Sequence, residues 1–158
     1  MSYEELINLE NIAQSSFSPC LISNAEIVAR VLFSPKHYNN GEITTNALEQ
    51  IFDPHGMSVL RINYEFDNSL ARTIELLQKD DINKYAGYAC ASVQKIREIL
   101  TSNGLRLYYV LDTATEDRVG HADVFAVRHE AVGLPKKAHN MYIKLQITEL
   151  FNEVVEAS

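Results

Sequence analysis

Three short apolar segments of the kind that form buried β-strands each contain charged or ionisable side chains. The segments cover residues 27–33, 57–62 and 121–127. The side chains that interrupt them are Arg30, Arg61, His121 and Asp123. A buried charge is costly unless it is paired and hydrogen-bonded, so these residues belong either to an internal ion-pair network or to a ligand site. Both interpretations are open on the sequence alone.

The composition limits the classes of protein that this chain can represent. It has 158 residues, 46% of them hydrophobic and 22% charged, which predicts a single α+β domain over residues 1–158. The net charge of −7 argues against nonspecific nucleic-acid binding, which needs a basic surface. No signal peptide is apparent, and no apolar run approaches the roughly 20 residues that span a bilayer. We therefore expect a cytoplasmic protein that does not bind membranes.

The two cysteines indicate neither a metal site nor a disulfide framework. Cys20 and Cys90 are far apart and lack the spacing of metal ligands. Cys90 lies among small apolar residues and is expected in the core. A reducing compartment fits this usage best.

Apolar residues at helical spacing and capping signals predict about five helices. A capping box of Ser2 and Glu5 begins the first, which should continue to about Gln14. Three more are expected over residues 46–52, from residue 68, and from residue 92 towards residue 104. Near the C-terminus, helical spacing over residues 143–154 is favoured over the strand-like alternation of residues 142–147.

About four strands complete the predicted fold. They cover residues 26–33, 58–64, 105–111 and 121–128. Residues 85–91 fit either a strand or the first turns of a helix. The last two strands should form a hairpin. This order of elements predicts helices packed on a mixed or antiparallel sheet.

Arg30 and the loop that follows its strand are the first candidate for a ligand site. The loop brings an ammonium group at Lys36 and an imidazole at His37 close to Arg30 in sequence. A guanidinium group suits a carboxylate or a phosphate, so we predict Arg30, Lys36 and Arg61 as ligand-binding residues. The competing interpretation is that Arg30 packs its stem on an edge strand while its head reaches water.

His121 and Asp123 form the second candidate. They lie two residues apart on a strand and therefore share one face. With His37 they are the predicted catalytic residues, in which a histidine transfers protons and a carboxylate stabilises its charge. Asp112 or His37 could complete a metal site, but no spacing identifies a third ligand, so no metal or cofactor is predicted. The competing interpretation places both side chains on the solvent face of a hairpin. The histidines expected to be solvated are His55, His129 and His139.

Ser58 is not expected to be a nucleophile. It lies three residues before Arg61, so the two side chains should point to opposite faces of a strand. The glycine that follows the serine in a nucleophile elbow is also missing. The motifs of nucleotide-binding, zinc-protease, thiol-redox and calcium-binding proteins are absent as well.

Two hypotheses of function follow. The first, which we favour, is a non-catalytic protein that acts through an interface with another protein or with a second copy of itself. The second is a metal-independent enzyme or binding domain for a phosphate- or carboxylate-bearing ligand, either a small molecule or RNA. The second requires Arg30, His37, His121 and Asp123 to share one cleft.

Overall fold

The computed structural model describes residues 2–12, 14–78 and 83–158. Its strands are β1 (Ile27–Ser34), β2 (Tyr38–Asn39), β3 (Glu42–Ile43), β4 (Met57–Arg61), β5 (Lys84–Ser92), β6 (Tyr108–Asp112), β7 (His121–Ala126) and β8 (Glu153–Glu156). Its helices are α1 (Tyr3–Leu9), the 3₁₀-helix η1 (Thr45–Phe52), α2 (Phe66–Leu77), α3 (Val93–Glu98), α4 (His129–Val132) and α5 (Lys136–Leu150).

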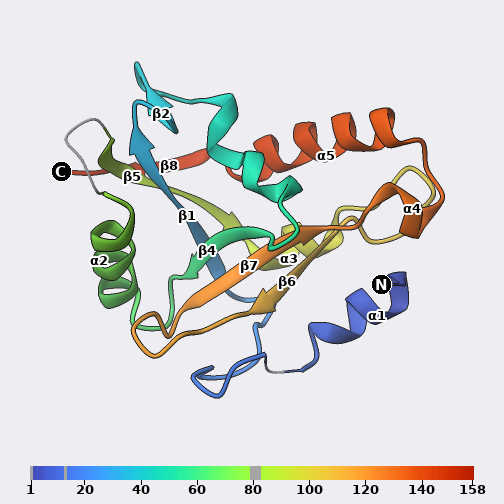
Figure 1. Cartoon of the computed structure of the whole chain (residues 1–158), viewed down its shortest axis with the longest axis horizontal. Coiled ribbons are helices and arrows are strands. Elements are labelled where there is room, and N and C mark those ends of the chain that lie inside the picture. The colour runs from blue at the N-terminus through green and yellow to red at the C-terminus, as the bar shows by residue number, and fades with distance from the viewer. Residues whose placement is uncertain (1, 13, 79–82) are drawn as a thin grey trace.

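An antiparallel sheet of six strands, in the order β6-β7-β4-β1-β5-β8, forms the centre of the molecule (Figure 1). Strands β2 and β3 form a separate two-stranded sheet. The predicted α+β class is confirmed, and the sheet is antiparallel throughout. The predicted element numbers are too low, since the described ranges hold eight strands and six helical segments.

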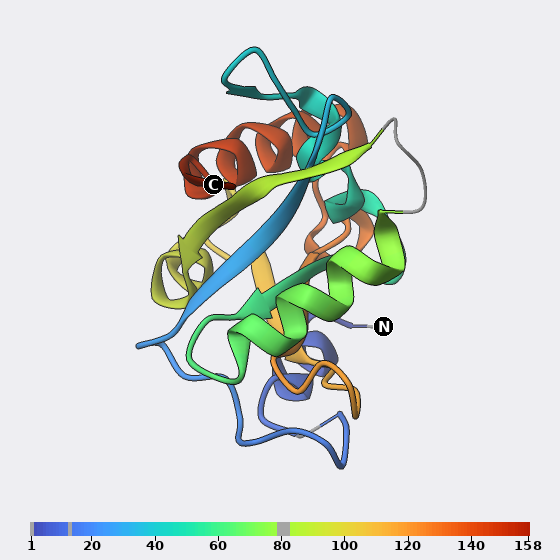
Figure 2. The same cartoon turned by 90° about the vertical axis from the view of Figure 1, so that its left-hand side faces the viewer.

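The two faces of the large sheet are covered unequally. The larger core joins one face of the strands to η1, α3 and α5 through buried side chains such as Val59, Ile96 and Ile147. A smaller cluster on the other face joins Val31, Phe33 and Leu60 to Phe66 and Leu70 of α2. Figure 2 shows α2 crossing in front of β4. The part of this face that lies beyond α2 carries polar residues.

Several predicted helix starts are confirmed, while the helix lengths differ. Ser2 and Glu5 form the expected capping box, and the Ser92 hydroxyl accepts from the Lys95 amide at the start of α3. Helix α1 ends at Leu9 and α3 at Glu98, so both are shorter than their apolar spacing predicts. Helix α2 begins at Phe66, before the predicted cap at residue 68.

Strand β8 replaces the predicted end of the C-terminal helix. Helix α5 ends at Leu150, the side chain of Phe151 is fully buried, and the chain returns along β5. The edge of β5 offers unpaired backbone groups, and pairing with them outweighs the helical spacing of these residues. Gly87 makes the close approach feasible: its φ is +133°, and an added Cβ would lie 2.1 Å from the Val155 carbonyl oxygen.

A narrow seam between β1 and β4 joins two three-stranded halves of the sheet. The Cα register pairs Val28 with Arg61 and Ala29 with Leu60, and the Ile62 amide donates to the Ile27 carbonyl at 3.0 Å. Beyond Ala29 the two strands separate, and side chains fill the gap.

In the part of the chain that the structure describes, no helix combines the length and the apolar character needed to cross a bilayer.

Candidate functional site

Arg61 is the centre of a buried ion-pair network. Its side chain is 0% exposed; Nε and Nη2 donate to the Glu26 carboxylate at 2.6 and 2.8 Å. Nη1 donates to Asp112 Oδ2 at 3.0 Å and to the Cys20 carbonyl at 2.8 Å. The Ser18 hydroxyl donates to the same Asp112 oxygen. All three charged groups are therefore paired with one another, as a structural network requires.

The surroundings of Arg61 keep its charge. Burial lowers the pKa of Arg61, but the hydrogen bond and charge of Glu26 outweigh this effect and raise the pKa above its ordinary value. The guanidinium also lies over the ring of Tyr64, 4.3 Å from the ring centre. Arg61 binds carboxylates, as its chemistry predicts, and these carboxylates belong to the protein itself.

Arg30 fills the gap beside the seam. Its Nε donates to the Ala47 carbonyl at 3.0 Å, and its Nη1 donates to Gln50 Oε1 at 2.9 Å and to the Ser58 carbonyl at 3.1 Å. Gln50 Oε1 in turn accepts from the Ser58 amide at 3.1 Å. The two side chains thus satisfy backbone groups of β4 that β1 no longer reaches. Burial lowers the pKa of Arg30 to about 10, with the charge of Asp123 acting in the opposite direction.

His37 is held neutral by its surroundings. Its Nδ1 accepts a hydrogen bond from the Phe33 amide at 3.2 Å, so this nitrogen carries no proton. Burial, together with the positive charges of Arg30 and Lys36, lowers the pKa of His37 to about 4. Lys36 itself is exposed. A histidine with so low a pKa is almost wholly unprotonated near pH 7 and is a weak base there.

His121 and Asp123 share one face of β7, as predicted, and two further residues join them. Ser58 Oγ lies 2.6 Å from His121 Nε2, because Leu60 pairs with His121 and Ser58 pairs with Asp123 across β4 and β7. His121 Nδ1 lies 2.8 Å from Thr113 Oγ1, which donates to Asp123 Oδ2 at 2.8 Å. We call these four residues the Ser58 relay.

The hydrogen bonds of the relay define the protonation of its histidine. His121 Nδ1 also lies 3.2 Å from the Thr113 carbonyl oxygen, which can only accept, so Nδ1 carries the proton. Nε2 is then the free acceptor that faces the Ser58 hydroxyl. Burial lowers the pKa of His121, although the charge of Asp123 opposes this, and the ring is therefore neutral near pH 7. Three hydrogen bonds therefore run in one direction, from Ser58 through His121 and Thr113 to the Asp123 carboxylate.

The remaining histidines and the cysteines differ in part from their predicted environments. His55 is exposed and His129 is half-buried, whereas His139 is buried with Nε2 2.8 Å from the Val127 carbonyl oxygen. The prediction of a solvated His139 is therefore wrong. Cys20 and Cys90 are both free, and Cys90 is half-buried. Within the described ranges, no three His, Cys, Asp or Glu side chains gather as metal ligands.

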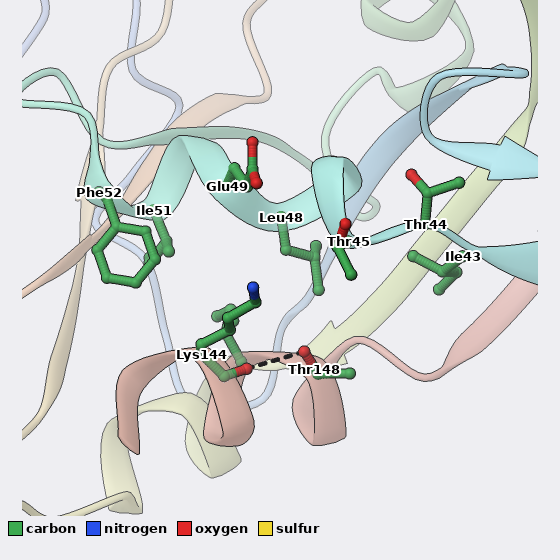
Figure 3. Close-up of a pocket in the computed structure, with 10 residues that line it drawn as sticks. Ile43, Thr44, Thr45, Leu48, Glu49, Ile51, Phe52, Lys144 and Thr148 are labelled. Carbon is green, nitrogen blue, oxygen red and sulfur yellow. Dashed lines mark hydrogen bonds between the residues drawn. The ribbon is translucent and has the colours of Figure 1, made fainter. Parts of the chain in front are cut away.

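A groove runs between η1 and α5. Three hollows of about 360, 370 and 540 Å³ adjoin one another along these helices, and Phe52 lines all three. Figure 3 shows one of them, with Leu48 pointing into the gap and the Lys144 side chain rising towards η1. We call this surface the η1–α5 groove. Its lining contains none of the six site residues predicted from the sequence.

Exposed apolar side chains and lysines surround this groove. Phe52 and Met141, which line it, are 45% and 60% exposed, and Leu145, one turn after Met141 on α5 but outside the lining, is 63% exposed. The lysines on its α5 side are Lys136, Lys137 and Lys144. Glu49 of η1 also lines the hollow shown in Figure 3 and places one carboxylate there. Two of the three hollows are therefore mainly apolar, and positive charges outnumber negative ones along the groove.

The structure brings together some of the predicted site residues. Arg30 interacts electrostatically with both Asp123 and His37. Arg61 belongs to the separate network with Glu26 and Asp112. A common cleft for Arg30, His37, His121 and Asp123 stays a prediction.

Sequence reasoning missed the residues that complete these surfaces. Ser58 and Thr113 join His121 through the pairing of β4 with β7 and through a turn, and neither relation can be recognised along the chain. Met141 and Leu145 could have been recognised, because they lie off the apolar stripe of α5 that Ile143 and Ile147 define. Apolar residues outside the buried stripe of a helix are a recognised sign of an interaction surface.

No protein-family model, curated protein or solved structure matches this chain. The geometry of the groove and of the relay therefore carries the functional argument.

Proposed function

We propose that this protein docks an acidic, apolar segment of a partner protein in the η1–α5 groove. The observation that carries the proposal is the position of Phe52, a half-exposed aromatic side chain that forms a wall of three adjoining hollows. Aromatic side chains at the centre of a concave surface are frequent anchors of protein interfaces.

The apolar part of the proposal rests on the side chains around Phe52. Leu48 and Ile51 line the groove as buried side chains, while Phe52 and Met141 leave much of their apolar surface in water. Each Å² of apolar surface removed from water stabilises a complex by roughly 25 cal/mol, so covering such side chains favours binding. A groove of this kind accepts the apolar side of a peptide segment.

The acidic character of the segment follows from the rim. Three of the seven lysines of the chain stand at this groove, although the protein as a whole has a net charge of −7. Cationic side chains outnumber carboxylates in the lining, because Arg128 joins the three lysines against Glu49 and Asp53. A local positive rim on an acidic protein favours a partner with carboxylates at the matching positions.

An anionic ligand held by Arg30, Lys36 and Arg61 has less support. Arg61 binds two carboxylates of the protein, and Arg30 binds three acceptors of its own.

Peptide display tests the proposal directly. A library of random 16-residue peptides is selected on the intact protein, and the dissociation constants of the selected peptides are measured by fluorescence anisotropy. We expect enrichment of Leu or Phe together with Asp or Glu. Phe52→Ala should weaken binding at least about tenfold, the range of an interface anchor. Lys144→Glu should weaken it and reduce its dependence on salt.

Matched controls come from elsewhere on the surface. Phe17 is 48% exposed and Lys95 is exposed, and neither lines the groove, so Phe17→Ala and Lys95→Glu should leave binding unchanged. Selected peptides without acidic bias, or equal binding to the Phe52→Ala variant, would contradict the proposal. Concentration-dependent dimerisation that Phe52→Ala abolishes would instead assign the groove to a second copy of the chain.

A further inference from the structure

We infer that Ser58 is an activated nucleophile that can accept the acyl group of a carboxylic ester. This site is separate from the docking function, because it depends on the Ser58 relay and on none of the side chains that line the η1–α5 groove. The hydrogen bonds of the relay lead from the Ser58 hydroxyl to the Asp123 carboxylate, and this direction allows His121 to remove the proton of Ser58.

The relay gives Ser58 the arrangement that a nucleophilic serine needs. Its hydroxyl faces the unprotonated Nε2 of His121 at 2.6 Å, within the reach of a general base. His121 Nδ1–H is oriented by Thr113, and the Thr113 hydroxyl is oriented by the Asp123 carboxylate at 2.8 Å. Thr113 thus transmits to His121 the orienting role that a carboxylate plays directly in a serine–histidine–aspartate triad.

Access and charge at the serine are also suitable. Ser58, Thr113 and Asp123 are half-buried, so the relay is partly open to solvent although His121 is 9% exposed. No described residue accepts a hydrogen bond from the Arg118 side chain, and its Nε is buried without a partner. The positive charge of Arg118 acts on His121, and we assign this guanidinium to the negative charge that develops during attack.

The strand position of Ser58 distinguishes this site from a nucleophile elbow. The serine stands on the face of the sheet that α2 covers only in part, beside the cluster of Val31 and Leu60. Its backbone is fixed by Arg30 and Gln50 across the gap at the seam. Arg30 of β1 and His121 of β7 therefore both contact Ser58 of β4, the first at its backbone carbonyl and the second at its hydroxyl.

The proposed reaction with an ester has two balanced stages. Ser58 Oγ attacks the carbonyl carbon while its proton moves to His121 Nε2, and the bond between the carbonyl carbon and the alkoxy oxygen breaks. The leaving alkoxide takes the proton from His121, which releases the alcohol and leaves acyl-Ser58. Water, deprotonated by His121, then attacks the acyl group; the carboxylic acid departs, and Ser58 recovers its proton.

A fluorophosphonate probe tests the nucleophile without knowledge of a natural substrate. Ser58 Oγ forms a bond to phosphorus, fluoride leaves, and the hydroxyl proton passes through His121 to water. Mass spectrometry of the intact protein and of its peptides should place the label on Ser58, with exposed Ser102 as the internal comparison. Hydrolysis of p-nitrophenyl acetate, measured with and without Ser58→Ala, provides a second readout.

The variants separate activation from structure. His121→Gln should lower the labelling rate by about 100-fold or more, within the range of general-base catalysis. Thr113→Val should lower it as well, while His55→Gln, a change at an exposed histidine, should not. Circular dichroism checks that each variant is folded, and Thr113→Val replaces His121→Gln if the latter does not fold. The labelling rate should also fall at acidic pH with a midpoint below 6.5, because burial lowers the pKa of His121.

The inference is overturned if the probe labels Ser58 no faster than Ser102, or if Ser58 is labelled as fast in folded His121→Gln or Thr113→Val protein as in the unmodified protein. Ester hydrolysis that survives Ser58→Ala also overturns it. None of these results affects the groove, because docking is measured through Phe52 and Lys144.

Discussion

Replacing Arg61 by Met should be one of the most damaging substitutions in this protein. The change keeps an apolar stem of similar length but leaves the carboxylates of Glu26 and Asp112, each 4% exposed, without their cation. Removing one partner of a buried ion pair typically costs about 3–5 kcal/mol, because the remaining charge stays buried. The lost contact with the Cys20 carbonyl adds to this cost, so we expect a loss at the upper end of that range.

Arg72→Met is the matched control, because it removes an arginine from exposed partners. Arg72 contacts Asp117 at 2.6 Å and Glu75 at 3.0 Å, with all three side chains at least 36% exposed. Exposed pairs of this kind contribute about 1 kcal/mol or less. Urea denaturation followed by circular dichroism at pH 7.5 gives the free energy of unfolding of both variants.

The comparison of the two variants decides whether burial makes the difference, because both lose one arginine and two ion pairs. Equal losses for Arg61→Met and Arg72→Met would refute the view that the network is a buried, mutually dependent set of charges.

Two further substitutions test other parts of the structure. The folded protein holds His37 neutral down to about pH 4, whereas the unfolded chain protonates it near 6.5, so stability should fall between these values as the pH is lowered. Allowing for partial exposure, His37 contributes about 1 kcal/mol to the loss of stability between pH 7.5 and pH 5. His37→Asn, which retains an acceptor for the Phe33 amide, should remove this contribution when the free energy of unfolding in urea is measured at the two pH values. An unchanged pH dependence would contradict this. Gly87→Ala should destabilise the protein by about 2 kcal/mol or more, because the added Cβ would clash with the Val155 carbonyl. If thermal denaturation gives a loss of stability below about 0.5 kcal/mol, β8 moves aside at little cost and the prediction is wrong.

The local parts of this fold could be predicted from the sequence, and its long-range relations could not. The strands around Arg30, Arg61 and His121 lie where their apolar runs predict, because alternation and β-branching are local signals. Strand β8 was missed because its residues continue a helical pattern, and only the open edge of β5 favours the strand. The local pattern of a strand does not reveal which neighbour it will meet.

The candidate site shows the same division. The shared face of His121 and Asp123 follows from strand geometry, and the opposite orientation of Ser58 and Arg61 does as well. The contact of Ser58 with His121 depends on register across β4 and β7, residues 63 positions apart. The prediction against Ser58 rested on its orientation relative to Arg61 and on the glycine missing after it, and it did not consider His121 as a partner.

The narrow seam of the sheet has a consequence for how the molecule opens. The halves β6-β7-β4 and β1-β5-β8 share few main-chain hydrogen bonds, so the common core and cross-strand side chains hold them together. Arg61 on β4 forms a salt bridge with Glu26, just before β1, and Arg30 on β1 donates a hydrogen bond to the Ser58 carbonyl on β4. We therefore expect amide hydrogen exchange to reveal two cooperative units that part along this line. The two arginines that interrupt the apolar strands would then contribute to the free energy of that opening.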